Sequence, residues 1–173
     1  SSDLPPPGSG FRDDDWRILA GHWHPVALSR EVSGAPVPVR LLGEPLVVHR
    51  LGDGVVRAAR DRCPHRGAAL SSGRIEGDRL VCAYHGLAYD ADGRCVGIPA
   101  HPGMAAPTML RLDTIPAREA YGLVWLRLLD EGAAEIPAFE EWSADDHVQV
   151  LPRSEEHTSE LQSPCNLVCR LLL

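Results

Sequence analysis

The chain has 173 residues, of which 44% are hydrophobic, and a formal net charge of −7 from 24 acidic and 17 basic residues. This length allows one domain with an ordinary apolar core, and the acidic balance argues against a nucleic-acid surface. No apolar run approaches the roughly 20 residues that span a bilayer, and the first residues do not form a secretory leader. We therefore expect a cytoplasmic protein that binds neither nucleic acid nor membrane.

The first 28 residues contain no pattern typical of a site. Residues 1–12 are rich in proline, glycine and serine, as in a flexible leader. A short helical turn or irregular segment is expected from Asp15, followed by an extended segment over 23–28. His22 and His24 have no acidic or thiol partner nearby in the sequence. We interpret both histidines as packing or surface residues.

The next segment has the pattern of a three-stranded antiparallel meander. Glycines, including an Asp-Gly step that favours a tight hairpin, separate the expected strands, which cover residues 38–42, 45–51 and 55–62. The third strand leads directly into Cys63. A loop at the end of a rigid strand is a suitable place for a metal ligand.

Two short motifs each combine one cysteine with one histidine. They are Cys63-Pro64-His65-Arg66-Gly67 and Cys82-Ala83-Tyr84-His85-Gly86, with sixteen residues between His65 and Cys82. Two thiolates and two imidazoles from two loops are the ligands of a Rieske-type [2Fe–2S] cluster, with the thiolates on one iron and the imidazoles on the other. Neutral imidazoles move the potential to roughly −150 to +300 mV, from about −400 mV for an all-cysteine plant-type cluster. The predicted cofactor-binding and metal-ligating residues are Cys63, His65, Cys82 and His85, and the predicted activity is one-electron transfer.

Hairpin signals also surround the second motif. Gly77-Asp78 predicts a turn before the strand that enters Cys82, and residues 90–93 predict another turn after His85. The two motif loops are therefore expected to meet at one end of a small sheet. Cys95 lies outside both motifs, and we interpret it as a small buried apolar residue.

The remaining strands are expected at residues 113–119 and 122–128. The second of them, which carries Trp125, is apolar on both faces and is therefore predicted to be central or covered. With only one short helical segment expected before these strands, the fold class is predicted to be all-β.

The motifs and their flanks resemble the N-terminal Rieske domain of ring-hydroxylating oxygenase alpha subunits. The resemblance rests on residues 63–68 (Cys-Pro-His-Arg-Gly-Ala), 82–90 (Cys-Ala-Tyr-His-Gly-Leu-Ala-Tyr-Asp) and 92–99, and it extends over about Trp16 to Leu129. It implies a Rieske-type fold of small antiparallel sheets over residues 13–130, with a cluster-binding subdomain made of two ligand loops.

The resemblance also implies a larger protein. In this family the cluster takes electrons from a ferredoxin or a flavin reductase and passes them to a mononuclear non-haem Fe(II) that attacks an aromatic or related organic substrate, usually in a homo-oligomer. Residues 131–152 are then the start of a linker to a missing catalytic domain. A mononuclear site of this type uses two histidines and one carboxylate, and His147 stands alone in that segment. No catalytic residue is therefore assigned within this chain.

The last 21 residues differ from the rest in composition. Residues 153–173 contain the chain's only asparagine and resemble the conceptual translation of sequencing-adapter DNA. A segment of this kind is excluded from fold reasoning, so His157, Cys165 and Cys169 are assigned no function.

Three alternatives differ from this interpretation. Rieske proteins of the cytochrome bc type carry one more cysteine in each loop, and here Ala68 and Tyr84 hold those places. A stand-alone Rieske-type ferredoxin would share the motifs but normally ends near the last strand. A structural zinc site also uses two cysteines and two histidines, but its usual spacings begin Cys-x2-Cys or Cys-x4-Cys.

Overall fold

The computed structural model describes residues 5, 10, 12–129 and 135–139. One helix, two short 3-10 turns and eleven strands lie in the described part, and all paired strands are antiparallel, which confirms the all-β class. The chain order is α1 (Asp13–Ala20), β1 (His24–Leu28), η1 (Ser29–Glu31), β2 (Val37–Leu41), β3 (Glu44–Arg50), β4 (Val56–Arg60), η2 (Leu70–Ser72), β5 (Arg74–Glu76), β6 (Arg79–Val81), β7 (Ala88–Tyr89), β8 (Cys95–Gly97), β9 (Thr114–Ile115), β10 (Ala117–Ala120) and β11 (Leu123–Leu126).

Sheet A contains three strands in the order β1-β11-β10. The central strand β11 is buried along its whole length, which confirms the prediction for the strand that carries Trp125. A two-residue turn joins β10 to β11, with φ of 58° at Tyr121 and 69° at Gly122. Two consecutive left-handed residues are the type I′ geometry that matches the twist of a hairpin.

Sheet B contains four strands in the order β2-β3-β4-β9. Its first three strands match the three strands of the predicted meander to within two residues at each end. The predicted strand over 113–119 is wrong in one respect, because it is divided at Pro116. Residues before the proline pair with β4 in sheet B, and residues after it pair with β11 in sheet A. Proline has no N–H to donate to a ladder, so the chain can change sheets at that residue.

The larger apolar core lies between sheets A and B and is closed at one end by α1. Trp16 of the helix is completely buried in it, and the alternating residues Leu46 and Val48 of β3 point into it. The opposite face of sheet B, which carries Val47 and Ala59, packs against a second core. Both faces of sheet B are therefore covered, which explains why the polar–apolar alternation of its sequence is blurred.

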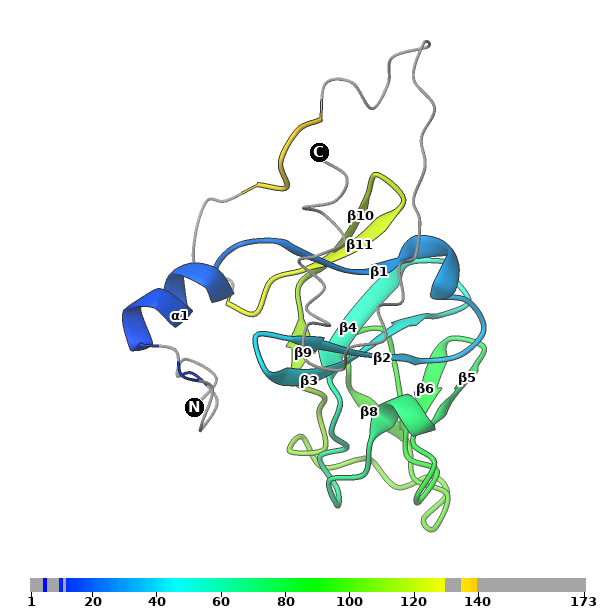
Figure 1. The fold of residues 1–173 in the computed structure, drawn as a ribbon. Helices are drawn as coiled ribbons and strands as arrows, with labels where there is room; N and C mark the ends of the chain where they lie inside the picture. Colours follow the sequence, from blue (N-terminus) through cyan, green and yellow to red (C-terminus); the bar gives the residue numbers. More distant parts are fainter. Residues whose placement is uncertain (1–4, 6–9, 11, 130–134, 140–173) are drawn as a thin grey trace, which may run out of the picture.

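Sheet C contains four short strands in the order β5-β6-β7-β8. Figure 1 shows it on the side of β2, β3 and β4 that is opposite β10 and β11. The expected hairpins at Gly77-Asp78 and at residues 90–93 are both confirmed. The two predicted ligand loops extend from this sheet and from the end of β4.

Candidate metal centre

The first ligand loop follows β4 and is closed by two backbone hydrogen bonds. The N–H of Cys63 donates to the carbonyl oxygen of Ala68 at 2.8 Å, and the N–H of Gly67 donates to that of Cys63 at 2.8 Å. Gly67 has a φ of +74°, a conformation that glycine adopts without steric cost. The motif glycine therefore lets the loop fold back on itself.

The second ligand loop, which follows β6, has the same pattern of bonds. The N–H of Cys82 donates to the carbonyl oxygen of Leu87 at 3.0 Å, and the N–H of Gly86 donates to that of Cys82 at 3.1 Å. Gly86 has a φ of +69°. The two loops are thus equivalent in backbone, although the histidine comes two residues after the cysteine in the first loop and three residues after it in the second.

The two cysteine side chains lie at the inner end of the loops. Cys63 is 2% exposed and Cys82 is 1% exposed, and both belong to the core between sheets B and C. Burial raises the pKa of the Cys82 thiol, and the neighbouring Cys63 thiol raises it further, while backbone N–H groups of Tyr84 and His85 lower it. The two sulfur atoms are therefore close neighbours, held away from water and within reach of backbone donors.

The two histidine side chains lie at the outer end of the same loops. His65 and His85 are both exposed, with ring centroids 4.7 Å apart and ring planes at 63°. The ring of Tyr84, itself 67% exposed, lies 3.9 Å from that of His85. The structure therefore brings the two predicted thiol ligands together in the core and the two predicted imidazole ligands together at the surface.

A tyrosine that the sequence analysis did not single out contacts one of the thiols. The hydroxyl of Tyr89 on β7 lies 3.2 Å from Sγ of Cys63. Tyr89 is completely buried, and burial raises the pKa of its hydroxyl, so that the proton stays on the oxygen. A metal-bound thiolate has no proton, which leaves the tyrosine as the donor of this hydrogen bond.

The arrangement suits a group with two metal atoms. Among the described residues, no three His, Cys, Asp or Glu side chains form a group that could hold one metal ion. The four side chains here form two unlike pairs, two soft sulfur donors and two imidazoles. This donor set matches the two chemically different irons of a cluster that has thiolates on one side and imidazoles on the other.

Comparison with known families agrees with this geometry. The Rieske [2Fe-2S] domain family matches residues 22–116, more than half of the chain. The chain belongs to this family. Its cofactor is accordingly a Rieske [2Fe–2S] cluster, and sequence relatives and solved structures place the domain more narrowly.

Several relatives are named as demethylases or as oxygenase components. Methylxanthine N1-demethylase NdmA of Pseudomonas putida is 43% identical over 73% of this chain and 38% of its own length. The oxygenase component of dicamba O-demethylase from Stenotrophomonas maltophilia is 41% identical over 68% of this chain and 35% of its own length. A structure of a Pseudomonas putida NdmA mutant with caffeine superposes with a TM-score of 0.70 at 42% identity, over 77% of this chain and 41% of that one.

The chain thus spans about two fifths of the length of these relatives. It is similar to the N-terminal Rieske domains of ring-hydroxylating oxygenase alpha subunits. None of the helices in the described ranges is long and apolar enough to cross a membrane.

Residues outside the Rieske motifs hold the ligand loops in place. The carboxylate of Asp61 accepts hydrogen bonds from the backbone N–H of Ser71 at 2.7 Å and from its hydroxyl at 2.5 Å, which ties the first loop to η2. Gly73 lies so close to the strand entering the second loop that an added Cβ would be 2.2 Å from the carbonyl oxygen of Val81. Sequence spacing gives no signal for either contact, because both join segments that meet only in the folded chain.

The other histidines and cysteines have separate environments. The ring nitrogens of His22 and His24 lie 2.7 Å and 2.8 Å from carbonyl oxygens of α1. His22 is exposed and His24 is half-buried, in agreement with their interpretation as packing or surface residues. Cys95 is partly buried against the core beside sheet C, close to the predicted environment. His49 is 3% exposed in β3. The remaining candidates lie outside the described residues: His147, His157, Cys165 and Cys169.

Proposed function

We propose that Cys63 and Cys82 hold one iron of the Rieske cluster and that His65 and His85 hold the other. The observation that carries the proposal is the pairing of two buried thiols with two exposed imidazoles on loops that have the same hydrogen bonds. Bound there, the cluster supplies a one-electron carrier with a potential of roughly −150 to +300 mV. The chain provides the pocket, the orientation of the ligands and the exclusion of water from the sulfur side.

The difference in burial between the two pairs sets the side on which electrons are exchanged. The thiol side is covered by the core that contains Leu70, Leu80 and Leu87. The imidazole side is open, because His65 and His85 are both exposed. Electron exchange with a partner is therefore expected across the imidazole edges, since any other direction crosses packed side chains.

The domain is proposed to serve as the electron-accepting part of an oxygenase alpha subunit. This proposal is supported by the sequence identity that the chain shares with a demethylase and an oxygenase component over part of their length. A catalytic domain with a mononuclear non-haem Fe(II), held by two histidines and one carboxylate, is proposed to follow residues 131–152. The substrate class is an aromatic or related organic molecule, and the complete protein is proposed to be a homo-oligomer.

A separate electron donor is part of this proposal. The dicamba relative is named an oxygenase component, so it works with at least one further component. We place the donor, a ferredoxin or a flavin reductase, on the face formed by His65, Tyr84 and His85. Exposed aromatic and imidazole rings at the end of a rigid domain suit a brief, weak encounter rather than a permanent interface.

Metal and sulfide analysis of the purified chain tests the ligand assignment. We expect two irons and two acid-labile sulfides per chain, lost in Cys82→Ala and kept in the matched variant Cys95→Ala. His85→Cys should lower the potential or lose the cluster, because a third thiolate adds negative charge. A Cys82→Ala protein with full iron and sulfide content would show that the assignment is wrong.

Resequencing the source DNA across the codons for residues 151–153 tests the oxygenase proposal. A reading frame that continues into a domain with paired histidines and a carboxylate is the expected result. A natural frame that stops near Pro152 would favour a ferredoxin-like carrier instead.

A further inference from the structure

Residues 135–139 lie against sheet A, on the face that is turned away from sheet B. This outer face is made by Trp23, Leu28, Leu123 and Trp125, each at most 7% exposed, and it is separate from the core between sheets A and B. Figure 1 shows the segment beside the β10–β11 hairpin, at the end of the molecule away from sheet C. Residues 135–139 thus fall within the expected linker, 131–152, and yet contact the domain.

Two side chains of the segment pack on the outer face of sheet A. Ile136 and Phe139 are half-buried against it, whereas the residues between them are exposed. The ring of Phe139 meets the ring of Tyr121 edge to face, with centroids 4.8 Å apart and planes at 84°. The backbone N–H of Phe139 also donates to the hydroxyl oxygen of Tyr121 at 3.4 Å. Because aromatic pairs of this geometry attract beyond the area they bury, Phe139 is held at the tip of the hairpin.

An ion pair at the other end of the segment contributes less. The guanidinium of Arg118 donates to the carboxylate of Glu135 at 2.6 Å, but the two side chains are 52% and 74% exposed. Water screens an ion pair that is this exposed, so the pair adds little stability. The same guanidinium lies over the ring of Trp23, 4.8 Å from its centroid. The apolar contacts of Ile136 and Phe139 therefore supply most of the attraction.

The backbone of Tyr121 indicates that its side chain serves a contact. Tyr121 has a φ of +58° in the β10–β11 turn, a conformation that is strained for a bulky residue and is usually taken by Gly, Asn or Asp. Among the described residues, Leu42 in the β2–β3 turn is the only other residue besides glycine with a positive φ, and it packs on the core between sheets A and B. Strain of this kind persists where the surrounding structure offsets it. At Tyr121 the offsetting contact is with Phe139.

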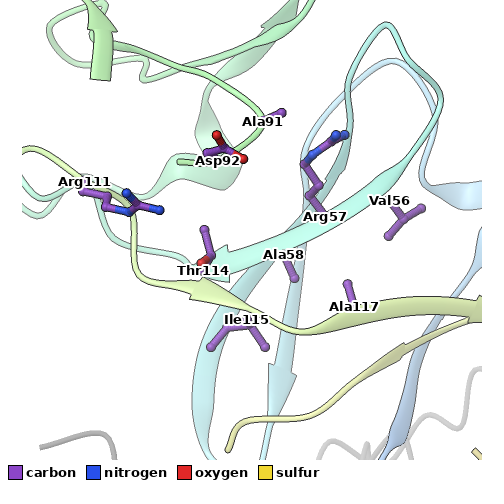
Figure 2. Close-up of a pocket in the computed structure, with 9 residues that line it drawn as sticks. All are labelled: Val56, Arg57, Ala58, Ala91, Asp92, Arg111, Thr114, Ile115 and Ala117. Atoms are coloured by element: carbon purple, nitrogen blue, oxygen red, sulfur yellow. The ribbon is translucent and has the colours of Figure 1, made fainter. Parts of the chain in front are cut away.

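The course of β10 brings the hairpin tip to the outer face. The chain crosses from sheet B to sheet A at Pro116, and Figure 2 shows Ile115 and Ala117 on either side of the crossing, next to a pocket of about 300 Å³ beside β4. Ala117 still packs on the core between sheets A and B, whereas Arg118 and Ala120 face the outer side. The turn that follows is therefore open to the segment that comes after β11.

We propose that the outer face of sheet A is a docking surface for residues 135–139, with Tyr121, Ile136 and Phe139 as its anchors. The occupant is a segment of this same chain, an apolar peptide with an acidic residue at its first position and an aromatic ring at its last. Docking covers two tryptophans and two leucines that would otherwise form an exposed apolar patch. It also makes residues 135–139 part of the domain and fixes the point, beside the β10–β11 turn, from which the chain continues.

Hydrogen exchange in the full chain, followed by NMR, tests the docking at the amide that donates to Tyr121. We expect the amide of residue 139 to exchange at least about tenfold more slowly than in an unstructured peptide. Phe139→Ala should abolish this protection and increase acrylamide quenching of tryptophan fluorescence, because Trp23 and Trp125 lose their cover. Glu135→Gln, which removes only the exposed ion pair, should change both readouts much less. An unprotected amide in the parent chain, or unchanged quenching in Phe139→Ala, would overturn the proposal.

Two turn variants separate docking from folding. Asparagine adopts the left-handed conformation more readily than tyrosine or leucine, so neither Tyr121→Asn nor Leu42→Asn strains its turn. Tyr121→Asn should increase acrylamide quenching as Phe139→Ala does. Leu42→Asn is the matched control and should leave quenching and the exchange at residue 139 unchanged, because Leu42 packs on the other core. No change in Tyr121→Asn, or equal changes in both variants, would contradict the assignment of the anchor.

The iron content of each variant is measured alongside the exchange and the quenching. It should equal that of the parent chain, because the anchors lie on sheet A and the ligand loops extend from sheet C and the end of β4. A failure of the docking proposal is therefore distinct from a failure of the cluster assignment.

Discussion

Sheets B and C are both four-stranded and antiparallel, but they are held together in different ways. The first three strands of sheet B contain five to seven residues each, and β3 and β4 bury apolar side chains on both faces. The strands of sheet C contain two or three residues each. Sheet C and its loops share the second core with sheet B and depend in addition on single close contacts, such as those of Gly73, Asp61 and Tyr89. Single substitutions should therefore affect the two regions by different physical causes.

The largest effect is expected from Gly73→Ala. The new methyl group would meet the carbonyl oxygens of Val81 at 2.2 Å and Leu70 at 2.9 Å, and these backbone atoms cannot move without displacing the strand that enters Cys82. We expect a loss above about 4 kcal/mol in the free energy of unfolding, together with loss of the cluster's visible absorption.

Gly77→Ala is the matched control for this substitution. Gly77 has a φ of +58°, but an added Cβ would have open space around it. We expect a loss of about 1–2 kcal/mol in urea unfolding, from backbone strain alone. Equal losses in the two variants would show that the close contact at Gly73 does not hold sheet C.

The next effect concerns the core between sheets A and B. Leu46 is completely buried there, and Leu46→Ala should lower the free energy of unfolding by about 3 kcal/mol through lost burial and a residual cavity. Val55→Ala, at a site that is 52% exposed next to β4, should change it by less than about 0.5 kcal/mol. A small effect at Leu46, measured by urea unfolding, would contradict burial as the main support of sheet B.

A decrease in pH should have a smaller effect on the free energy of unfolding, through His49 on β3. Burial, with a further contribution from Arg57, lowers the pKa of His49 to about 4, below the ordinary 6.5 of the unfolded chain. The unfolded state therefore binds the proton first, and stability falls as pH decreases from about 6.5 toward 4. Between pH 7 and pH 5 the loss should be about 2 kcal/mol.

His49→Gln isolates this contribution, because glutamine does not titrate. Urea unfolding of both proteins at pH 7 and pH 5 should show a larger loss in the parent chain than in the variant. Equal pH dependence would show that the buried imidazole does not couple folding to pH in this range.

The smallest effect is expected on the reduction potential, when the hydrogen bond to the sulfur of Cys63 is removed. Tyr89→Phe removes the hydroxyl that lies 3.2 Å from Sγ of Cys63 and should lower the reduction potential, since a hydrogen bond to sulfur favours the more negative, reduced state. A net hydrogen bond of roughly 0.5–1.5 kcal/mol corresponds to about 20–60 mV for one electron. In a redox titration, Tyr84→Phe should leave the potential unchanged, because Tyr84 is exposed and its ring lies beside His85.

The sequence predicts those parts of the structure that depend on local patterns, and it does not predict contacts between segments that meet only in the folded chain. The meander of sheet B follows from apolar segments and glycine turns, because strand and turn propensities are local. The division at Pro116 was missed, since the choice between two sheets depends on neighbours distant in sequence. The four ligands of the candidate site carry a local signal in two short motifs. Tyr89, Asp61 and Gly73 carry none, because their roles come from contacts made only after folding.

The pocket beside β4 was also beyond the sequence analysis. Its residues come from β4, the β7–β8 turn, β9 and β10, and no spacing relates them. The hollow arises from the short overlap of β9 with β4, which is a property of register. Register across strands that are far apart in the chain is set by the whole core rather than by local pattern.

Mössbauer spectroscopy of the oxidised, iron-57-enriched protein tests the central claim most directly. Thiolates on one iron and imidazoles on the other make the two irons chemically different, so we expect two distinct signals of equal area. His65→Ala and His85→Ala should each disturb only the signal of the imidazole-bound iron or remove both signals with the cluster. A single signal from two equivalent irons, or a protein that binds zinc in place of iron, would show that these four residues do not hold a Rieske cluster.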